Sequence, residues 1–110
     1  MTQVLVVLCT CPDSPTAESL ATGLVENGLA ACVNILPEIR SIYRWQGEVQ
    51  QDAETLLIMK TGRETYLRME SWLVEHHPYD VPEVLALPIE RGAADYLDWV
   101  IQETTKTGGG

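Results

Sequence analysis

Apolar residues recur along the chain with two different periods, and these predict strands alternating with amphipathic helices. Residues 3–9 form a short Val/Leu-rich run, and residues 29–36 alternate between two faces, so both segments are predicted to be strands. Between them, apolar side chains return every three to four positions until Asn27 and Gly28. This spacing predicts a helix that has Ser14 as its N-cap.

The middle of the chain predicts a long hairpin. After Pro37, which we expect to interrupt the second strand, the alternation of apolar and polar residues resumes over residues 39–45. Gln46 and Gly47 are typical of a tight turn, and residues 48–59 predict the returning strand. This hairpin is the polar and aromatic part of the predicted sheet.

The second half of the chain predicts two more helices and one more strand. Thr61 and Glu64 have the spacing of a capping box, which predicts the start of a helix that must end before Pro78. Residues 83–89 predict a fourth strand, and apolar side chains within residues 93–101 recur at helical spacing. The order β-α-β-β-α-β plus a C-terminal helix predicts an α+β, ferredoxin-like split βαβ fold with an antiparallel sheet.

We expect a single domain over residues 1–104, with fraying from Thr104 and a flexible Gly-rich tail over residues 105–110. In this fold the helices cover one face of the sheet. The other face and the hairpin around Tyr43 and Trp45 would leave apolar surface and unpaired strand edges in water. Self-association of the chain is therefore expected.

Composition narrows the classes of function. The 110 residues include 16 acidic and 7 basic side chains, for a net charge of −9. Because nucleic-acid binding depends on Lys and Arg to neutralise phosphates, the charge argues against it and favours cations as partners. The longest apolar run, residues 4–9, is too short to span a membrane, and no secretion signal is evident at the N-terminus. We expect a cytoplasmic protein without a nucleic-acid or membrane partner.

The candidate chemistry rests on three cysteines and two histidines. Cys9, Cys11 and Cys32 come from the first strand, the loop after it and the second strand, and His76 and His77 close the second predicted helix. An odd cysteine count in a cytoplasmic chain predicts free thiols. Thiolate and imidazole together favour copper(I), zinc and similar ions. The alternatives are cysteines packed as small hydrophobes, histidines that complement the helix C-terminus, and a thiol nucleophile with a histidine base.

The hairpin offers two further groups of side chains. Carboxylates that could hold a hard cation, or simply form a solvated face, are Glu38, Glu48, Asp52 and Glu54. Polar or aromatic side chains that could line a cleft between subunits, or belong to the interface itself, are Tyr43, Trp45, Lys60 and Tyr79.

Six motifs together resemble the CutA family of divalent cation tolerance proteins. They are TCPD at residues 10–13, LAACVN at 29–34, SIYRWQGE at 41–48, KT at 60–61, HHPYDVPE at 76–83 and YLDW at 96–99. The resemblance covers residues 4–100 without an evident gap. It implies a ferredoxin-like subunit in a tight homotrimer, similar in architecture to the PII signalling proteins, and a role in tolerance to copper and other divalent ions. One departure is Glu38, which replaces the glycine common after Pro37.

The resemblance also implies a set of metal ligands. In copper-binding members, the proposed ligands match Cys9, His76 and His77 of this sequence, with Cys32 as a secondary candidate. Cys11 stands where the family often has other residues, so the resemblance assigns it no role.

The leading hypothesis is a cytoplasmic, homotrimeric protein that binds a divalent metal of the copper type and is not an enzyme. One alternative is a regulatory or scaffolding trimer that binds a small ligand between subunits, as PII proteins do. A second alternative is a thiol enzyme that uses Cys9 or Cys32.

Overall fold

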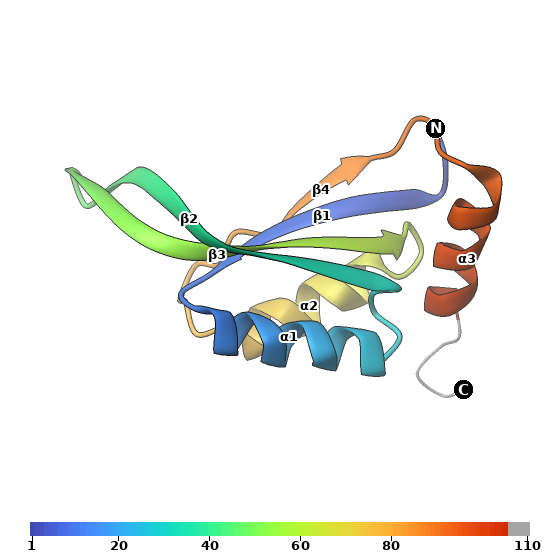
Figure 1. The fold of residues 1–110 in the computed structure, drawn as a ribbon, viewed down its shortest axis with the longest axis horizontal. Helices are drawn as coiled ribbons and strands as arrows, with labels where there is room; N and C mark the ends of the chain where they lie inside the picture. Colours follow the sequence, from blue (N-terminus) through green and yellow to red (C-terminus); the bar gives the residue numbers. More distant parts are fainter. Residues whose placement is uncertain (106–110) are drawn as a thin grey trace.

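The fold is a four-stranded antiparallel sheet with two helices on one face and a third at its end (Figure 1). A computed structural model describes residues 1–105. The elements in chain order are β1 (Val4–Cys11), α1 (Ser14–Glu26), β2 (Cys32–Trp45), β3 (Glu48–Gly62), α2 (Tyr66–His76), β4 (Leu85–Pro88) and α3 (Ala94–Thr105). The strands lie in the order β2-β3-β1-β4, and each neighbouring pair is antiparallel. The predicted α+β, ferredoxin-like arrangement is confirmed.

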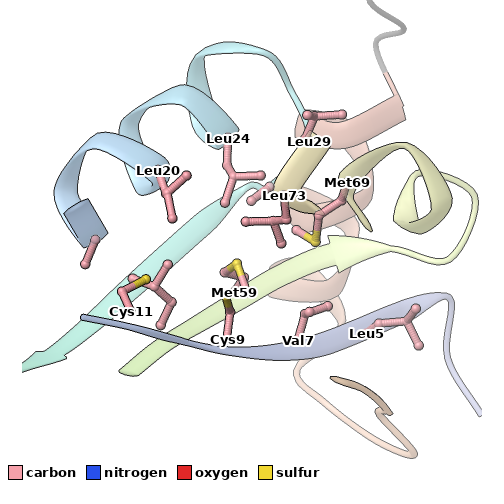
Figure 2. Packing of buried hydrophobic residues seen from close by; sticks show 13 residues of the cluster. Leu5, Val7, Cys9, Cys11, Leu20, Leu24, Leu29, Met59, Met69 and Leu73 are labelled. Atoms are coloured by element: carbon pink, nitrogen blue, oxygen red, sulfur yellow. The ribbon is translucent and has the colours of Figure 1, made fainter. Parts of the chain in front are cut away.

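The core lies between the sheet and the pair α1 and α2. Every second residue of β1 points toward these helices, because successive side chains of a strand face opposite sides. Figure 2 shows side chains of β1 and β3 meeting those of both helices. The fully buried members with the largest side chains are Leu24, Leu57, Met59, Met69, Leu73 and Val7.

The β2–β3 hairpin projects well beyond the rest of the sheet and gives the molecule its longest dimension of 44 Å (Figure 1). The predicted interruption at Pro37 is a register shift between Leu36 and Ile39, after which the same strand continues to its closing pair, Trp45 with Glu48. The turn has positive φ at Gln46 (50°) and Gly47 (81°). Positive φ at both central residues matches the twist of a two-residue hairpin.

Two predicted helix starts are wrong. The N-cap of α1 is Asp13, whose Oδ1 accepts from the backbone N–H of Thr16 at 2.9 Å, while Ser14 is already helical. The predicted capping box of Thr61 and Glu64 does not open α2. Thr61 belongs to β3, and its buried hydroxyl donates to the carbonyl of Leu29 at 2.8 Å. The hydrogen bond of Thr61 to the distant Leu29 takes the place of the local capping interaction. A rule based on local spacing does not include such tertiary contacts.

The C-terminal helix is anchored at its end. Thr104 is fully buried, and its carbonyl accepts a 2.7 Å hydrogen bond from the hydroxyl of Thr65. In the structure α3 extends through Thr105, whereas the sequence predicted fraying from Thr104 and a tail from residue 105. The remaining predicted tail, residues 106–110, lies outside the described residues. Among residues 1–105, no helix is long and apolar enough to cross a membrane.

The sheet face opposite α1 and α2 is open, as expected. Leu85 and Leu87 of β4 are 56% and 47% exposed. They pair with Leu8 and Val6 of β1, so their side chains lie side by side on this face. The tip of the hairpin adds exposed apolar side chains, which are Ile42, Tyr43, Trp45 and Val49.

Candidate metal centre

Cys9 and Cys11 lie two residues apart on β1, so their side chains point to the same face of the sheet. That face is covered by the helices, and both thiols are fully buried. Figure 2 shows the two side chains on the helix-facing side of β1. Neither cysteine is in a disulfide, which agrees with the predicted free thiols.

His77 brings an imidazole to the same place. It follows the last helical residue of α2, where its backbone N–H donates to the carbonyl of Leu73 at 2.8 Å. The adjacent Pro78 cannot supply an N–H to continue the helix. The extended backbone at His77 turns its ring toward β1. One ring nitrogen of His77 and the Sγ atoms of Cys9 and Cys11 lie within 4.8 Å of one another.

Both nitrogens of the His77 ring have hydrogen-bond partners within the protein. Nδ1 accepts from the backbone N–H of Tyr79 at 3.1 Å. Nε2 lies 2.8 Å from the carbonyl of Thr10, which can only accept, so Nε2 carries the proton. The network therefore assigns the neutral Nε2–H tautomer to His77.

The two thiols titrate as a coupled pair. A hydrogen bond with Cys11, followed by burial and the negative charges of Cys11, Glu83 and Glu54, raises the pKa of Cys9. The same hydrogen bond lowers the pKa of Cys11. The pair therefore gives up its first proton more easily than its second. A cation that binds both sulfurs favours the loss of both protons.

Two of the predicted ligands lie elsewhere. His76 faces α1, and its ring stacks on Trp72 with the ring centres 4.1 Å apart. Its Nδ1 lies 2.8 Å from the carbonyl of Trp72. Cys32 lies on the opposite face of the sheet from Cys9, where the Nζ of Lys60 is 3.9 Å from its Sγ. His76 lies on the last turn of α2 whereas His77 follows it with an extended backbone, so the two rings point to different groups.

Sequence reasoning left the role of Cys11 open, although a signal for it was present. Cys9 and Cys11 are separated by one residue, and a strand that continues to Cys11 places both on one face. The predicted strand ended at Cys9, which put Cys11 in a loop and concealed this relation. Of the predicted metal ligands, the structure thus brings together Cys9 and His77, and it adds Cys11.

The predicted cleft residues do not gather at one place within the described chain. Tyr43 and Trp45 lie on the projecting hairpin, where the Tyr43 hydroxyl donates to Asp52. The Tyr79 hydroxyl donates to Oε2 of Glu54 at 2.7 Å, and burial together with this carboxylate raises the pKa of Tyr79. The fourth residue, Lys60, stands near the far end of β3 and bonds the side-chain oxygen of Asn34. Two of the hairpin carboxylates are thus hydrogen-bonded to tyrosines.

Comparison with known proteins decides the family. The family model for the CutA1 divalent ion tolerance protein matches residues 5–103. The chain belongs to the CutA family. The divalent-cation tolerance protein CutA of Thermus thermophilus is 50% identical over 99 residues, which cover 90% of this chain and 96% of that protein.

Solved CutA structures share the fold. The crystal structure of CutA1 from Oryza sativa has a TM-score of 0.92 and 42% identity, covering 96% of this chain and 97% of that one. CutA from Archaeoglobus fulgidus, described as a periplasmic divalent cation tolerance protein, has a TM-score of 0.89 and 36% identity, covering 92% and 98%. The chain spans 53% to 60% of the human, mouse and Xenopus laevis CutA proteins that it matches. The predicted family membership is confirmed.

The donor set of the buried cluster fits a soft metal. Thiolate sulfur prefers Cu(I), Zn²⁺ and similar ions, while Mg²⁺ and Ca²⁺ prefer oxygen. The cluster places two sulfurs and one imidazole nitrogen, all from buried residues, within 4.8 Å of one another, a spacing that is compatible with one such ion. Among divalent cations, the site's residues therefore suit soft ions such as Zn²⁺ better than Mg²⁺ or Ca²⁺.

Proposed function

We propose that this chain is a homotrimeric protein that binds a divalent metal ion of the copper type and acts in metal-ion tolerance. The observation that carries the proposal is the cluster of Cys9, Cys11 and His77, whose donor atoms lie within 4.8 Å of one another. Membership of the CutA family supports the role in tolerance. The metal is the cargo of such a protein, so binding must be reversible.

The proposed site is built on Cys9, with Cys11 and His77 beside it. Cys9 and His77 come from the ligand set that the family resemblance implied, and Cys11 comes from the geometry. His76 is left out because its ring lies against Trp72. Cys32 is left out because it lies across the sheet.

Isothermal titration at pH 7.5 tests this site. Cd²⁺ is a suitable probe because it is thiophilic, divalent and not reduced by thiols. We expect one ion per chain for the wild type and at least a tenfold weaker affinity for Cys9→Ser, which removes a direct ligand. Cys32→Ser is the matched control, since it removes a thiol outside the cluster. Equal affinities for the wild type and Cys9→Ser would contradict the proposal.

The homotrimer is proposed from the open sheet face and the projecting hairpin. Leu85, Leu87 and the hairpin's apolar side chains would remain in contact with water in a single chain. Association of three chains would cover them and could bring Tyr43, Trp45, Lys60 and Tyr79 together between subunits. Sedimentation equilibrium should give three times the chain mass of 12.2 kDa. A monomer mass at micromolar concentration would contradict the assembly.

A second candidate function is the binding of a small ligand between subunits. The observation that favours it is a polar group within the open apolar face, where Lys60 contacts Asn34 and Cys32. A cation set among apolar residues would suit an anionic ligand. Titration of the assembled protein with nucleotides and with Cd²⁺ separates the two functions, because binding of the anionic ligand requires an intact Lys60 and binding of Cd²⁺ does not.

The proposal also places the protein in the cytoplasm and assigns it no catalytic role. Three free thiols suit a reducing compartment, and cell fractionation tests the location. The complete burial of Cys9 argues against it as the nucleophile of a thiol enzyme, because a nucleophile must reach its substrate. Cys32 is partly exposed and is the thiol on which the alkylation test bears most directly. Rapid alkylation of one of these thiols near neutral pH would contradict the non-catalytic assignment.

A further inference from the structure

The coordination of the metal can be taken further than the proposed function, on which this inference rests. Cys9 and Cys11 belong to one strand, so the same rigid backbone holds both sulfurs. Metal–thiolate bonds are about 2.3 Å long, so two sulfurs on one ion lie up to about 4.6 Å apart. The Sγ atoms lie within 4.8 Å of one another, close to this span, so a small shift of the side chains brings both within bonding distance of one ion.

The His77 ring is close to the sulfurs but is committed to other bonds. Its Nε2–H donates to the carbonyl of Thr10, and its Nδ1 accepts from the N–H of Tyr79. To bind a metal through either nitrogen, the ring would leave the partly buried carbonyl of Thr10 or the backbone N–H of Tyr79 without its hydrogen bond to the ring. Each such loss costs free energy, because a polar group shielded from water is left unpaired. His77 thus links the end of α2 and the loop after it to β1 through hydrogen bonds.

Charge selects the ion class. Two thiolates carry two negative charges, and a dication makes the complex neutral. A monocation would leave a net negative charge in a fully buried place, which is costly. The carboxylates of Glu54 and Glu83 act on Cys9 with the same negative sign and add to that cost.

We infer that Cys9 and Cys11 together bind one thiophilic dication as a pair of thiolates. In this arrangement His77 keeps β1 and the end of α2 in position through its hydrogen bonds and does not ligate the ion. Binding forms two metal–sulfur bonds and breaks two S–H bonds. The two protons go to the solvent, and the oxidation state of the metal and of both sulfurs is unchanged.

The direct test is proton-detected ¹¹³Cd NMR on the wild-type full chain, which identifies ligands by their coupling to the bound ion. We expect ¹¹³Cd correlations to the Cβ protons of both Cys9 and Cys11, and none to the ring protons of His77. A correlation to the His77 ring, or to only one of the two cysteines, would overturn the inference. No variant is needed, so failure of a mutant to fold does not affect the result.

Titration of variants provides the second test. Loss of a direct ligand should exceed the 10- to 100-fold effect typical of outer-shell groups, so we expect Cys11→Ser to weaken Cd²⁺ binding by about 100-fold or more. Cys32→Ser should match the wild type. Release of two protons per ion, measured in weakly buffered solution, should accompany binding to the wild type.

The outcomes separate the two proposals. If Cys9 correlates with the bound ion while Cys11→Ser binds as the wild type does, the pairing of thiolates is wrong and the proposed function stands. If the wild type binds no Cd²⁺, both are wrong.

Discussion

Glu38 has a backbone φ of 61°, in the left-handed region that costs a residue with a side chain about 1–2 kcal/mol. It follows Pro37 at the point where the register between β2 and β3 shifts. The family resemblance suggested that this turn would suit a glycine, and the backbone explains that preference: glycine alone adopts this φ without a steric penalty. The replacement thus leaves strain in the hairpin that the rest of the sheet must offset.

Replacing Glu38 with glycine should therefore stabilise the protein. We expect Glu38→Gly to raise the free energy of unfolding by about 1 kcal/mol, because the relief of strain exceeds the entropy that glycine adds to the unfolded chain. Urea denaturation measures the change. Glu48→Gly is the control at an exposed strand position without positive φ, and it should be destabilising. A destabilising Glu38→Gly would contradict the strain argument.

A second residue-scale prediction concerns alkaline pH. Burial and the hydrogen bond to Glu70 raise the pKa of Tyr66 to about 12, from 10.0. Below pH 10 the tyrosine is neutral in both states. Between about pH 10 and 12 only the unfolded state ionises, so the stabilising contribution of Tyr66 is lost as pH rises. The stability difference between the wild type and Tyr66→Phe, measured by urea denaturation, should decrease over this interval. A constant difference would contradict the shift.

At the scale of elements, close contact between helices depends on single small residues. A Cβ placed on Gly23 of α1 would lie 2.6 Å from the Trp72 ring of α2. The ring cannot move away freely, because it stacks on His76. Gly23 therefore allows the close approach of the two helices that cover the sheet and the cluster of Cys9, Cys11 and His77.

Gly23→Ala should destabilise the protein although alanine is the better helix former. Helix propensity favours alanine by about 1 kcal/mol, whereas overpacking costs about 1–3 kcal/mol. We expect a net loss of up to about 2 kcal/mol, measured by thermal unfolding. Thr22→Ala, at the exposed neighbouring position, should gain stability from propensity alone. If both substitutions were stabilising, the Trp72 contact would not be limiting.

The positions of the helices and strands were largely predictable, because each element repeats its own local period. The apolar spacing of α1 and the alternation of β3 belong to continuous segments of sequence and need no knowledge of distant partners. Their ends were less predictable. Thr61 has the spacing of an N-cap, yet it stays in β3 because its hydroxyl finds Leu29, which is 32 residues away.

On the scale of the whole molecule, the sheet face opposite α1 and α2 has no covering element among the described residues. It carries apolar residues on β1 and β4, and the hairpin extends it at one end (Figure 1). Covering such a face by association removes apolar surface from water. Each Å² of apolar surface buried stabilises the assembly by about 25 cal/mol. The proposed homotrimer is the arrangement that would stabilise this face.

A charge on the open face should prevent association without unfolding the subunit. We expect Leu87→Glu to shift the protein to smaller species in sedimentation equilibrium, because Leu87 is half-exposed in the single chain and would be buried in the assembly. Leu67→Glu, on the outer surface of α2, is the control and should assemble normally. Unchanged mass for Leu87→Glu would mean that β4 lies outside the interface.

The sequence by itself determined the order of elements, the fold class and the family, because periodicity and continuous motifs are local properties of a chain. Tertiary structure alone decided which donors meet. Cys11 joins Cys9 because β1 extends two residues further than its apolar run. His77 turns toward β1 while His76 turns toward Trp72, because one lies past the end of α2 and the other lies on its last turn. Such choices depend on contacts between segments nearly 70 residues apart, as between His77 and Thr10, and local spacing does not encode them.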